Sequence, residues 1–467
     1  MPSNARRPFS RLLAVWLAAP VMALAACQPS GEETTAEAGV WPHEQSDIAP
    51  DPAVVYGVFE NGLRYAILEN DTPSGAAAVR LIIETGSLGE DEDQRGLAHF
   101  LEHMAFNGTT HVPEGEMVPL LERYGLAFGP DTNAFTSFEY TGYQLDLPST
   151  EPEVVDAALF LMRETASEMT LSAEAIERER GVILSERRTR DTPIARFFER
   201  YRETLYPGTL IPERNPIGLP EVIETAGPAP FERFYEDFYR PDNAMIVVVG
   251  DIDAADIERR LADGFALDLP GVDLDHAPAF ADWAAPDEPA PMVDIGELQP
   301  EAAPDFTVFE DPDVVTILAI DAISRGRPEP DTAAARREDL LTRIGGAILQ
   351  RRLQSDINRG ASPLVNISVS HGLDFDIARR ANMTAVTSPD RWREALAAME
   401  TELRRAREYG FTQAELDEQL AEIHTALRDA AAQADTRDSA RLAGAIWKAA
   451  LDGDVFSHPR DSLERFE

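Results

Sequence analysis

This sequence has very little cysteine, and it has few basic side chains relative to acidic ones. There is one cysteine in 467 residues, so no disulfide bond can form within the chain. Lysine and arginine number 42 against 83 aspartates and glutamates, which gives a formal net charge of -41. This excess of negative charge argues against nucleic acid and anionic lipid surfaces as electrostatic partners. It is compatible with basic peptides as substrates, and equally with a role in solubility or adaptation to salt.

A long hydrophobic run of the kind that spans a membrane is also missing at the N-terminus. The apolar stretch from Leu12 to Ala26 follows Arg6, Arg7 and Arg11 and is too short for a comfortable membrane span. A positive start followed by a short apolar stretch is typical of a secretory signal. We therefore predict that residues 1–26 are a signal peptide.

The end of this stretch, Leu24-Ala25-Ala26-Cys27, resembles the lipobox of bacterial lipoproteins. The resemblance implies that Cys27 is lipidated and anchors the chain to a membrane of the bacterial cell envelope, facing the periplasm. Gln28 after the cysteine favours the outer membrane by the same resemblance. Residues 27–50 are rich in Pro, Glu, Ser and Thr and are expected to be a flexible tether. The alternative is an ordinary signal peptide with an incidental cysteine.

Beyond the tether, the pattern of strands followed by helices occurs twice. We predict one domain over 51–268 and a second over 306–467, separated by a linker at 269–305 rich in Pro, Ala and acidic residues. Each domain is expected to be α+β, with a mixed, mostly antiparallel sheet covered by helices. The second domain ends in helices without a final strand, so we expect it to be incomplete at its C-terminus.

Four local predictions in the first domain depend on turn and helix signals. Asn61-Gly62, between two strand-like runs, predicts a β-hairpin with a type I′ turn. Ala134 to Leu147 is interpreted as a strand, and Pro119 is expected to kink a helix. Helical periodicity extends from Ser172, a plausible N-cap, to about Tyr206.

The sequence Gly96-Leu97-Ala98-His99-Phe100-Leu101-Glu102-His103-Met104 carries the clearest chemical signal. His99 and His103 are spaced i, i+4, so on a helix they lie one turn apart on the same face. Two imidazoles so placed can bind one zinc ion, and Glu102 can reach a water beside it. This order of residues is H-x-x-E-H.

A catalytic zinc ion needs a third protein ligand. The helix after Ser172 offers Glu177, Glu179 and Glu186. Glu179 and Glu186 are seven residues apart and share a helix face, so one can bind the metal while the other supports it.

These two stretches together resemble the pitrilysin/insulysin family of zinc peptidases, the inverzincins. The resemblance covers about residues 50–467 and is strongest at 96–109 and 177–188. It implies half of a clamshell-shaped peptidase, with one zinc ion per chain. It assigns His99, His103 and Glu186 as metal ligands, Glu102 as general base, and Glu179 as the supporting acid.

The same resemblance extends to the segment Asp131 to Ser137. It implies that Asn133 and Ala134 bind the backbone of an extended substrate by β-augmentation. The expected activity is endopeptidase cleavage of peptides or unfolded protein segments. The family also uses an Arg–Tyr pair from the opposite half of the clamshell, and no match for that pair is found here. A further C-terminal half or a partner subunit is therefore expected to supply it.

Two other functions stay open at this point. In the first, the chain is a non-catalytic assembly or binding lipoprotein with the same fold. In the second, the chain binds zinc, and the zinc ion only supports the structure. His111 and the acidic run Glu90-Asp91-Glu92-Asp93 are interpreted as loop residues. The acidic run also suits the N-terminus of the helix that follows it.

Overall fold

The computed structural model describes residues 39–127, 129, 131–300 and 306–467. The predicted signal peptide, the lipidation of Cys27 and the first part of the tether lie outside these residues. Among the described helices, none combines the length and the apolar character needed to cross a membrane.

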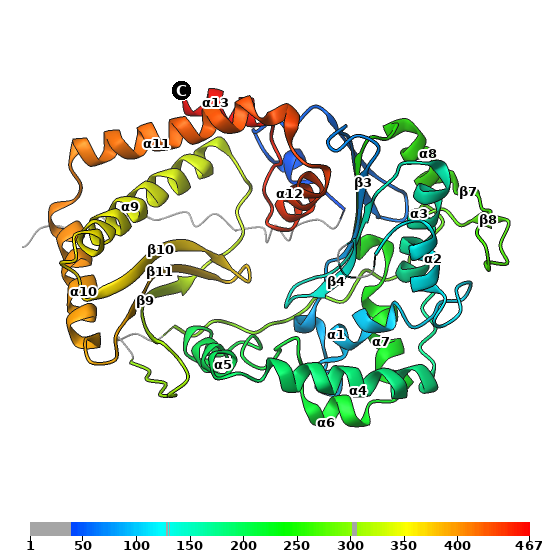
Figure 1. The fold of residues 1–467 in the computed structure, drawn as a ribbon, viewed down its shortest axis with the longest axis horizontal. Coiled ribbons are helices and arrows are strands. Elements are labelled where there is room, and N and C mark those ends of the chain that lie inside the picture. The colour runs from blue at the N-terminus through cyan, green and yellow to red at the C-terminus, as the bar shows by residue number, and fades with distance from the viewer. Residues whose placement is uncertain (1–38, 128, 130, 301–305) are drawn as a thin grey trace, which may run out of the picture. The chain divides into compact units, whose positions relative to one another are not determined.

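The first part of the chain is built on a six-stranded mixed sheet (Figure 1). Its strands are β1 (Val54–Val58), β2 (Arg64–Glu69), β3 (Ala77–Ile83), β4 (Thr132–Thr136), β5 (Thr141–Leu147) and β6 (Ala244–Gly250). The order is β1-β2-β6-β3-β5-β4, with β2 and β6 parallel and the other pairs antiparallel. β4 is therefore an edge strand.

Helices connect and cover these strands. They are α1 (Leu97–Met104), α2 (Met117–Arg123), α3 (Pro152–Ser167), α4 (Ala173–Arg190), α5 (Pro193–Leu205), α6 (Pro220–Thr225), α7 (Pro228–Phe238) and α8 (Ala254–Asp263). Short elements complete this part: η1 (Pro42–Gln45), η2 (Ser87–Gly89), η3 (Pro241–Asn243), β7 (Phe265–Ala266) and β8 (His276–Ala277).

The second part has a three-stranded antiparallel sheet made of β9 (Thr316–Arg325), β10 (Leu364–Asp374) and β11 (Ala378–Thr387), in the order β10-β11-β9. Its other elements are α9 (Ala333–Asn358), α10 (Trp392–Tyr409), α11 (Gln413–Ala432), η4 (Ala434–Thr436), α12 (Ser439–Leu451) and α13 (Pro459–Phe466). The order β4-β5-β3 in the first sheet has the same connections as β10-β11-β9, with α1 and α9 in equivalent places. The prediction of an α+β fold with two similar helix-covered sheets is confirmed.

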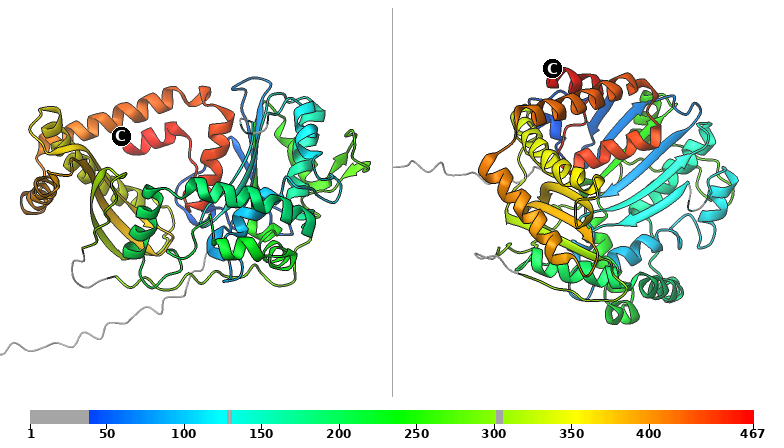
Figure 2. Two further views of the ribbon diagram at one scale, coloured as in Figure 1. Left: turned by 60° about the horizontal axis from the view of Figure 1, so that its bottom comes forward. Right: turned by 60° about the vertical axis from the view of Figure 1, so that its left-hand side comes forward.

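Both faces of the central strands are buried, which explains their unbroken apolar sequences. On β6, Ile246 and Val248 point into the main core with helices of the first part. Val247 and Val249 point to the opposite face and pack against α12, which comes from the end of the chain (Figures 1 and 2). Three side chains of α12 complete this second core: Leu442, Ala443 and Ile446.

The described part of the predicted linker, 269–300, is mostly irregular but packs closely on the first part. Leu269, Phe280 and Trp283 are buried in the main core. The side-chain amide of Asn61 donates to the carbonyls of Phe280 and Trp283 at 2.8 and 3.0 Å. The segment therefore contributes to the core beside β1 and β2, and its role as a domain boundary stays a prediction.

The predicted type I′ turn is wrong. The β1–β2 connection closes with a bond from Gly62 N–H to the Phe59 carbonyl at 2.9 Å, and Gly62 has φ +92°. Asn61 is not among the non-glycine residues with positive φ, as a type I′ turn would require. The amide of Asn61 binds the segment around Phe280 instead, so a tertiary contact fixes this turn.

Three further local predictions are corrected. The strand predicted over 134–147 is a hairpin, β4 and β5, whose turn spans Ser137 to Tyr140. The helix predicted over 172–206 ends at Arg190, and Pro193 begins α5 behind the N-cap Thr192, because proline suits the first turn of a helix and disfavours helical geometry before it. Pro119 lies in the first turn of α2, where its missing N–H costs nothing. The N-cap at Ser172 is confirmed.

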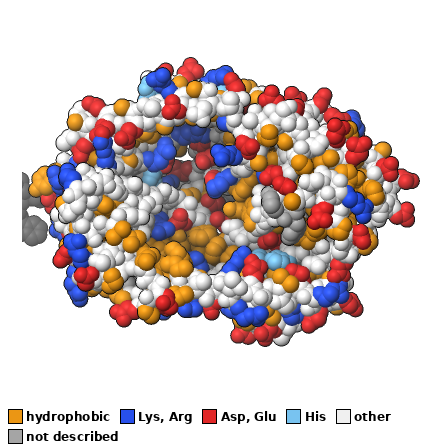
Figure 3. Space-filling view, viewed as in Figure 1, with side chains coloured by type: hydrophobic (Ala, Val, Ile, Leu, Met, Phe, Trp, Pro, Cys, Tyr) orange, Lys and Arg blue, Asp and Glu red, His pale blue; other side chains and the backbone are white. Residues whose placement is uncertain are grey.

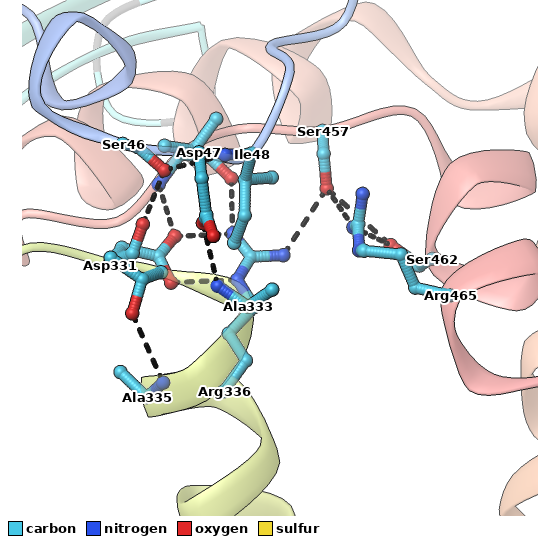
Figure 4. A network of polar contacts seen from close by, with 12 residues as sticks. Ser46, Asp47, Ile48, Asp331, Ala333, Ala335, Arg336, Ser457, Ser462 and Arg465 are labelled. Atoms are coloured by element: carbon cyan, nitrogen blue, oxygen red, sulfur yellow. Dashed lines mark hydrogen bonds and ion pairs between the residues drawn. The ribbon is translucent and has the colours of Figure 1, made fainter.

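A buried carboxylate joins three distant segments (Figure 4). Asp331 receives two bonds from the Arg336 guanidinium and one from the Val455 N–H at 2.8 Å. Its backbone carbonyl accepts a bond from the Ser46 hydroxyl. Asp47 caps the start of α9 by accepting from Ala333 N–H at 2.8 Å. The segment with Ser46 and Asp47, which belongs to the predicted flexible tether, is thereby fixed to α9 and to the loop before α13.

We expect Asp331→Ala to lower the free energy of unfolding by about 3 kcal/mol, because it leaves the Arg336 guanidinium without its anion and the Val455 N–H without its acceptor. The measurement is urea unfolding followed by circular dichroism. Asp435→Ala is the matched control, since Asp435 pairs with Arg460 while both side chains are exposed, at 74% and 61%. Equal midpoints for the two variants would contradict the prediction.

Candidate metal centre

Helix α1 is buried along almost its whole length, yet it carries the three polar side chains of the motif. His99 and Glu102 are 4% and 7% exposed, and His103 is half-buried. The two imidazole rings lie one turn apart, with their centroids separated by 5.0 Å. The i, i+4 spacing thus places both rings on the face predicted from the sequence.

The N-terminus of α1 is held by a carboxylate from the acidic run before it. Glu90 is 3% exposed, and its Oε1 accepts bonds from the N–H groups of Gly96 and Ala98 at 2.9 Å each. Burial raises the pKa of Glu90 to about 8, although these bonds favour the charged form. Gly96 has φ +104°, and a Cβ there would lie 2.7 Å from the Cα of Gly218. Glu90 is therefore a buried cap and not a solvated loop residue.

Helix α4 brings the acidic ligand to the histidines. Glu186 Oε2 lies 3.3 Å from His103 Nε2 and 3.6 Å from His99 Nε2. Its other oxygen is paired with Arg190, one turn further along the helix. Ligand atoms of His99, His103 and Glu186 all lie within 4.8 Å of one another.

This set of donors fits a zinc ion. Tetrahedral zinc with ligands at the usual 2.0–2.2 Å keeps its ligand atoms about 3.4 Å apart, close to the separations of Glu186 from the two imidazoles. Burial, then His103 and Arg190, lower the pKa of His99 to about 3, so its imidazole is neutral, which is the form that binds metals. Two imidazoles and one carboxylate leave a fourth position for water.

A second carboxylate on α4 orients His103. Glu179 Oε1 lies 2.9 Å from His103 Nδ1, which leaves Nε2 directed at Glu186. The hydrogen bond with His103 lowers the pKa of Glu179. Asn107 donates to the other oxygen of Glu179 at 3.2 Å and to the His103 carbonyl at 3.1 Å. Carboxylates that fix a ligand imidazole in this way are common around metal sites. Glu177, the remaining candidate on this helix, is exposed and paired with Arg180.

Glu102 points from α1 toward the edge strand β4. Its Oε2 accepts a bond from the Thr136 hydroxyl at 2.9 Å. Burial raises the pKa of Glu102 to about 6, against the opposing effect of this bond. A carboxyl group with such a pKa can take up and release a proton near neutral pH.

The hydrogen bonds of the β4–β5 hairpin determine which backbone groups face outward. Ser137 N–H bonds to the Tyr140 carbonyl and Asp146 N–H to the Asp131 carbonyl, both at 2.8 Å. Bonded and non-bonded pairs alternate in an antiparallel ladder, so Ala134 and Thr136 direct their N–H and C=O groups away from β5. Ala134 N–H is 3.0 Å from its neighbour's side-chain oxygen, Asn133 Oδ1. No described strand pairs with this edge.

The structure thus brings His99, His103, Glu179 and Glu186 together, with Glu102 on the same helix as the histidines. Glu177 lies outside this group, and Asn133 and Ala134 lie on β4 next to Thr136, which binds Glu102. The structure adds three residues without a role predicted from the sequence, Asn107, Thr136 and Arg190, and it confirms for Glu90 the predicted fit of the acidic run to the helix N-terminus. Asn107 and Arg190 follow His103 and Glu186 by four residues, a spacing that could have indicated contact. His111 lies outside the site, with Nδ1 2.9 Å from the buried Glu164.

A hollow of about 1010 Å³ lies elsewhere, between α9 and the β9–β11 sheet. Charged side chains at its rim have partners, because Arg343 pairs with Asp339 and Arg351 with Glu418. On the face drawn in Figure 3, acidic and basic side chains are intermixed and do not form one patch of a single sign. Among the described residues, the side chains that could bind a metal ion together are those of the candidate metal centre.

The amino-acid sequence matches the models of a known protein family. Residues 65–209 match "Insulinase (Peptidase family M16)", and residues 229–423 match "Peptidase M16 inactive domain". Over 220 residues the chain is 36% identical to "Probable zinc protease PqqL" of Haemophilus influenzae, covering 47% of this chain and 24% of that protein. Over 423 residues it is 29% identical to "Probable zinc protease PqqL" of Escherichia coli, covering 89% of this chain and 43% of that protein.

A solved structure shows the same fold. The first half of the periplasmic protease PqqL from Escherichia coli superposes with a TM-score of 0.79 at 27% identity, covering 90% of this chain and 86% of that one. The chain spans less than half the length of the two PqqL relatives. The two family matches and the shared fold show that this chain belongs to the M16 family, the insulinase and pitrilysin family of zinc peptidases, and resembles the N-terminal half of its PqqL-like members.

Proposed function

We propose that this chain carries the catalytic site of a zinc-dependent endopeptidase that cleaves peptides or unfolded protein segments. The observation that carries the proposal is the convergence of ligand atoms from His99, His103 and Glu186, with Glu102 on the same helix. The names of the relatives support the reaction class. The net charge of -41 favours basic peptides among the substrates.

In this proposal each side chain has a separate task. His99, His103 and Glu186 hold one zinc ion, which when bound polarises the scissile carbonyl and lowers the pKa of water. Glu102 removes a proton from water and delivers it to the leaving amine. Thr136 keeps the Glu102 carboxylate in place, and Glu179 holds His103 in the ligating orientation.

The substrate binds as an extended strand along β4. Ala134 offers its outward N–H and C=O groups to the substrate backbone, and an incoming carbonyl replaces the contact with Asn133 Oδ1. Asn133 is exposed beside it. Backbone pairing accepts many sequences, as an enzyme for unfolded segments requires.

The complete enzyme is proposed to need a second half. Either further C-terminal domains or a partner subunit supply the Arg–Tyr pair that contacts the substrate carbonyl. The matched relatives are more than twice as long as the part that aligns, which supports this proposal. The periplasm is the proposed location, by similarity to the periplasmic PqqL and by the signal-like N-terminus. Lipidation of Cys27 stays a proposal from the sequence.

Replacing Glu102 by glutamine is expected to lower kcat by roughly 10²- to 10⁴-fold, because the amide cannot accept the proton. Zinc content, measured by mass spectrometry of the metal, should stay at one ion per chain. Undiminished cleavage of an unstructured peptide by this variant would exclude Glu102 as the base. Full zinc content without any cleavage by the native chain and its second half would favour the non-catalytic lipoprotein.

Replacing Glu186 by glutamine should abolish stoichiometric zinc binding, because it removes one of three ligands. Glu179→Gln should weaken zinc binding by about 10- to 100-fold, since the orienting bond to His103 is changed. Glu177→Gln on the same helix is the matched control and should bind zinc as the native chain does. Competition with a chelator of known affinity gives the three values. If Glu177→Gln and Glu186→Gln lose zinc equally, the ligand assignment is wrong.

The isolated chain should bind zinc but cleave peptides slowly, and addition of a matching C-terminal half should raise kcat/KM. Peptidase assays with and without that half, at equal zinc content, measure the effect. Full activity of the chain as a monomer, established by light scattering, would contradict the need for a second half.

A further inference from the structure

The strand proposed to receive the substrate is contacted by side chains from the second part of the chain. This inference rests on the proposed function of β4, and it concerns how that strand is held. β4 pairs with β5 alone, so its position depends on β5 and on contacts at its faces and at the turn. Thr136 joins β4 to Glu102 at 2.9 Å, so a shift of the strand moves its free edge relative to the general base.

The first contact comes from α12. Trp447 stacks on Phe135 of β4 with ring centroids 5.9 Å apart and an interplanar angle of 29°. The same indole lies 5.4 Å from the ring of Tyr140, which begins the return to β5. Gly142 on β5 leaves the room for Phe135, since a Cβ there would lie 2.3 Å from its ring.

Helix α12 is a firm support for this indole. Its apolar side, with Leu442, Ala443 and Ile446 buried, packs on the face of the first sheet around Val247 and Val249. Trp447 is thereby presented to the β4–β5 hairpin from an element anchored on the neighbouring strands of the same sheet.

The second contact comes from the tip of the β10–β11 hairpin. Phe375 lies 5.4 Å from Phe138 in the β4–β5 turn and 5.2 Å from Tyr206, measured between ring centroids. The Tyr206 hydroxyl donates to Asp374 at 2.7 Å and fixes the base of this tip. The β4–β5 turn also binds η2 through Leu88 N–H to the Phe138 carbonyl at 2.8 Å.

This tip has a costly backbone conformation. Phe375 and Asp376 have φ values of 51° and 55°, and they are the only described non-glycine residues with positive φ. Left-handed geometry is unfavourable for a bulky side chain such as phenylalanine, and it persists where surrounding contacts require it. Phe375 and Asp376 are the two central residues of the turn that Ile377 N–H closes on the Asp374 carbonyl at 3.2 Å, and positive φ at both positions is the geometry of a type I′ hairpin turn. The turn directs the Phe375 ring to Phe138 and Tyr206.

We propose that Trp447 and Phe375 are positioning residues for the substrate strand. They hold the β4–β5 hairpin from two sides, so the free edge of β4 keeps a fixed place beside Glu102. Residues 229–423, which match a domain described as inactive and include Phe375, thereby take part in binding the peptide. Trp447 and Phe375 increase the order of β4 and the affinity for the peptide. They do not contact the metal ligands.

The test uses the full chain with Glu102→Gln, which binds a labelled, unstructured, cationic peptide without cleaving it. Hydrogen exchange of the β4 and β5 amides should accelerate about fivefold in Trp447→Ala and in Phe375→Ala, because each loses aromatic contacts of moderate strength. The peptide Kd should rise by a similar factor in each variant. Zinc content should not change, which separates positioning from damage to the metal centre.

Two controls make the result specific. Trp392→Ala removes an indole from α10, outside these contacts, and should change neither β4 exchange nor peptide affinity. Trp447→Phe keeps an aromatic ring and should restore most of both values. If an alanine variant does not fold, Trp447→Leu and Phe375→Leu, which keep apolar volume, decide the same question through the same measurements.

Unchanged β4 exchange and unchanged peptide Kd in the Trp447 and Phe375 variants would overturn the inference. An equal effect of Trp392→Ala would also overturn it, because the effect would then be general destabilisation. A different result would show that the proposed function is wrong: the Glu102→Gln chain would then bind no zinc or no peptide. The exchange of the β4 amides still decides the inference about the strand in that case.

Discussion

The central constraint in this structure is the burial of a helix that carries polar side chains. α1 must lie in the core and still present two imidazoles and a carboxylate, and an uncompensated polar group there would cost stability. Several polar groups of this helix have partners from other elements, whereas the buried Nδ1 of His99 has no hydrogen-bond partner. Glu90 binds the N–H groups at its start, Thr136 binds Glu102, and Glu179 binds His103. β4, α4 and the loop before α1 each supply a hydrogen-bond partner to α1.

The second part of the chain is tied to the first by features of different kinds. α12 covers the face of the first sheet opposite to the main core, and the β10–β11 tip packs against the β4–β5 turn. Asp331 adds a polar junction among α9, the segment before β1 and the loop before α13. The second part of the chain, whose described residues supply none of the candidate metal ligands, is thus part of the framework that surrounds the candidate site.

The sequence was most informative where function depends on spacing within one helix. His99 with His103, and Glu179 with Glu186, are set by helical periodicity, so their common faces were predictable. The role of Thr136 was not predictable, because it depends on a strand that meets α1 in space. The acidic run before α1 did indicate a carboxylate at the start of the helix, but the burial of Glu90 depends on tertiary packing. The Asn61 turn was predicted wrongly because a tertiary contact to Phe280 outweighs the local preference. Pro193 was a local signal for the end of one helix and the start of the next, but the helical periodicity continues across it and favoured a single helix.

The helix that supplies Glu179 and Glu186 is held unlike the one that supplies the histidines. Of the 18 residues of α4, three are buried, namely Ala175, Ile176 and Ile183, whereas seven of the eight residues of α1 are buried. Polar contacts hold α4 in place of apolar burial, since Arg180 donates to the carbonyls of Ile223 and Ala226 and Arg187 donates to that of Gly218. A metal ion bound by Glu186 and the two histidines would add one more polar link between a helix buried in the core and a helix at the surface.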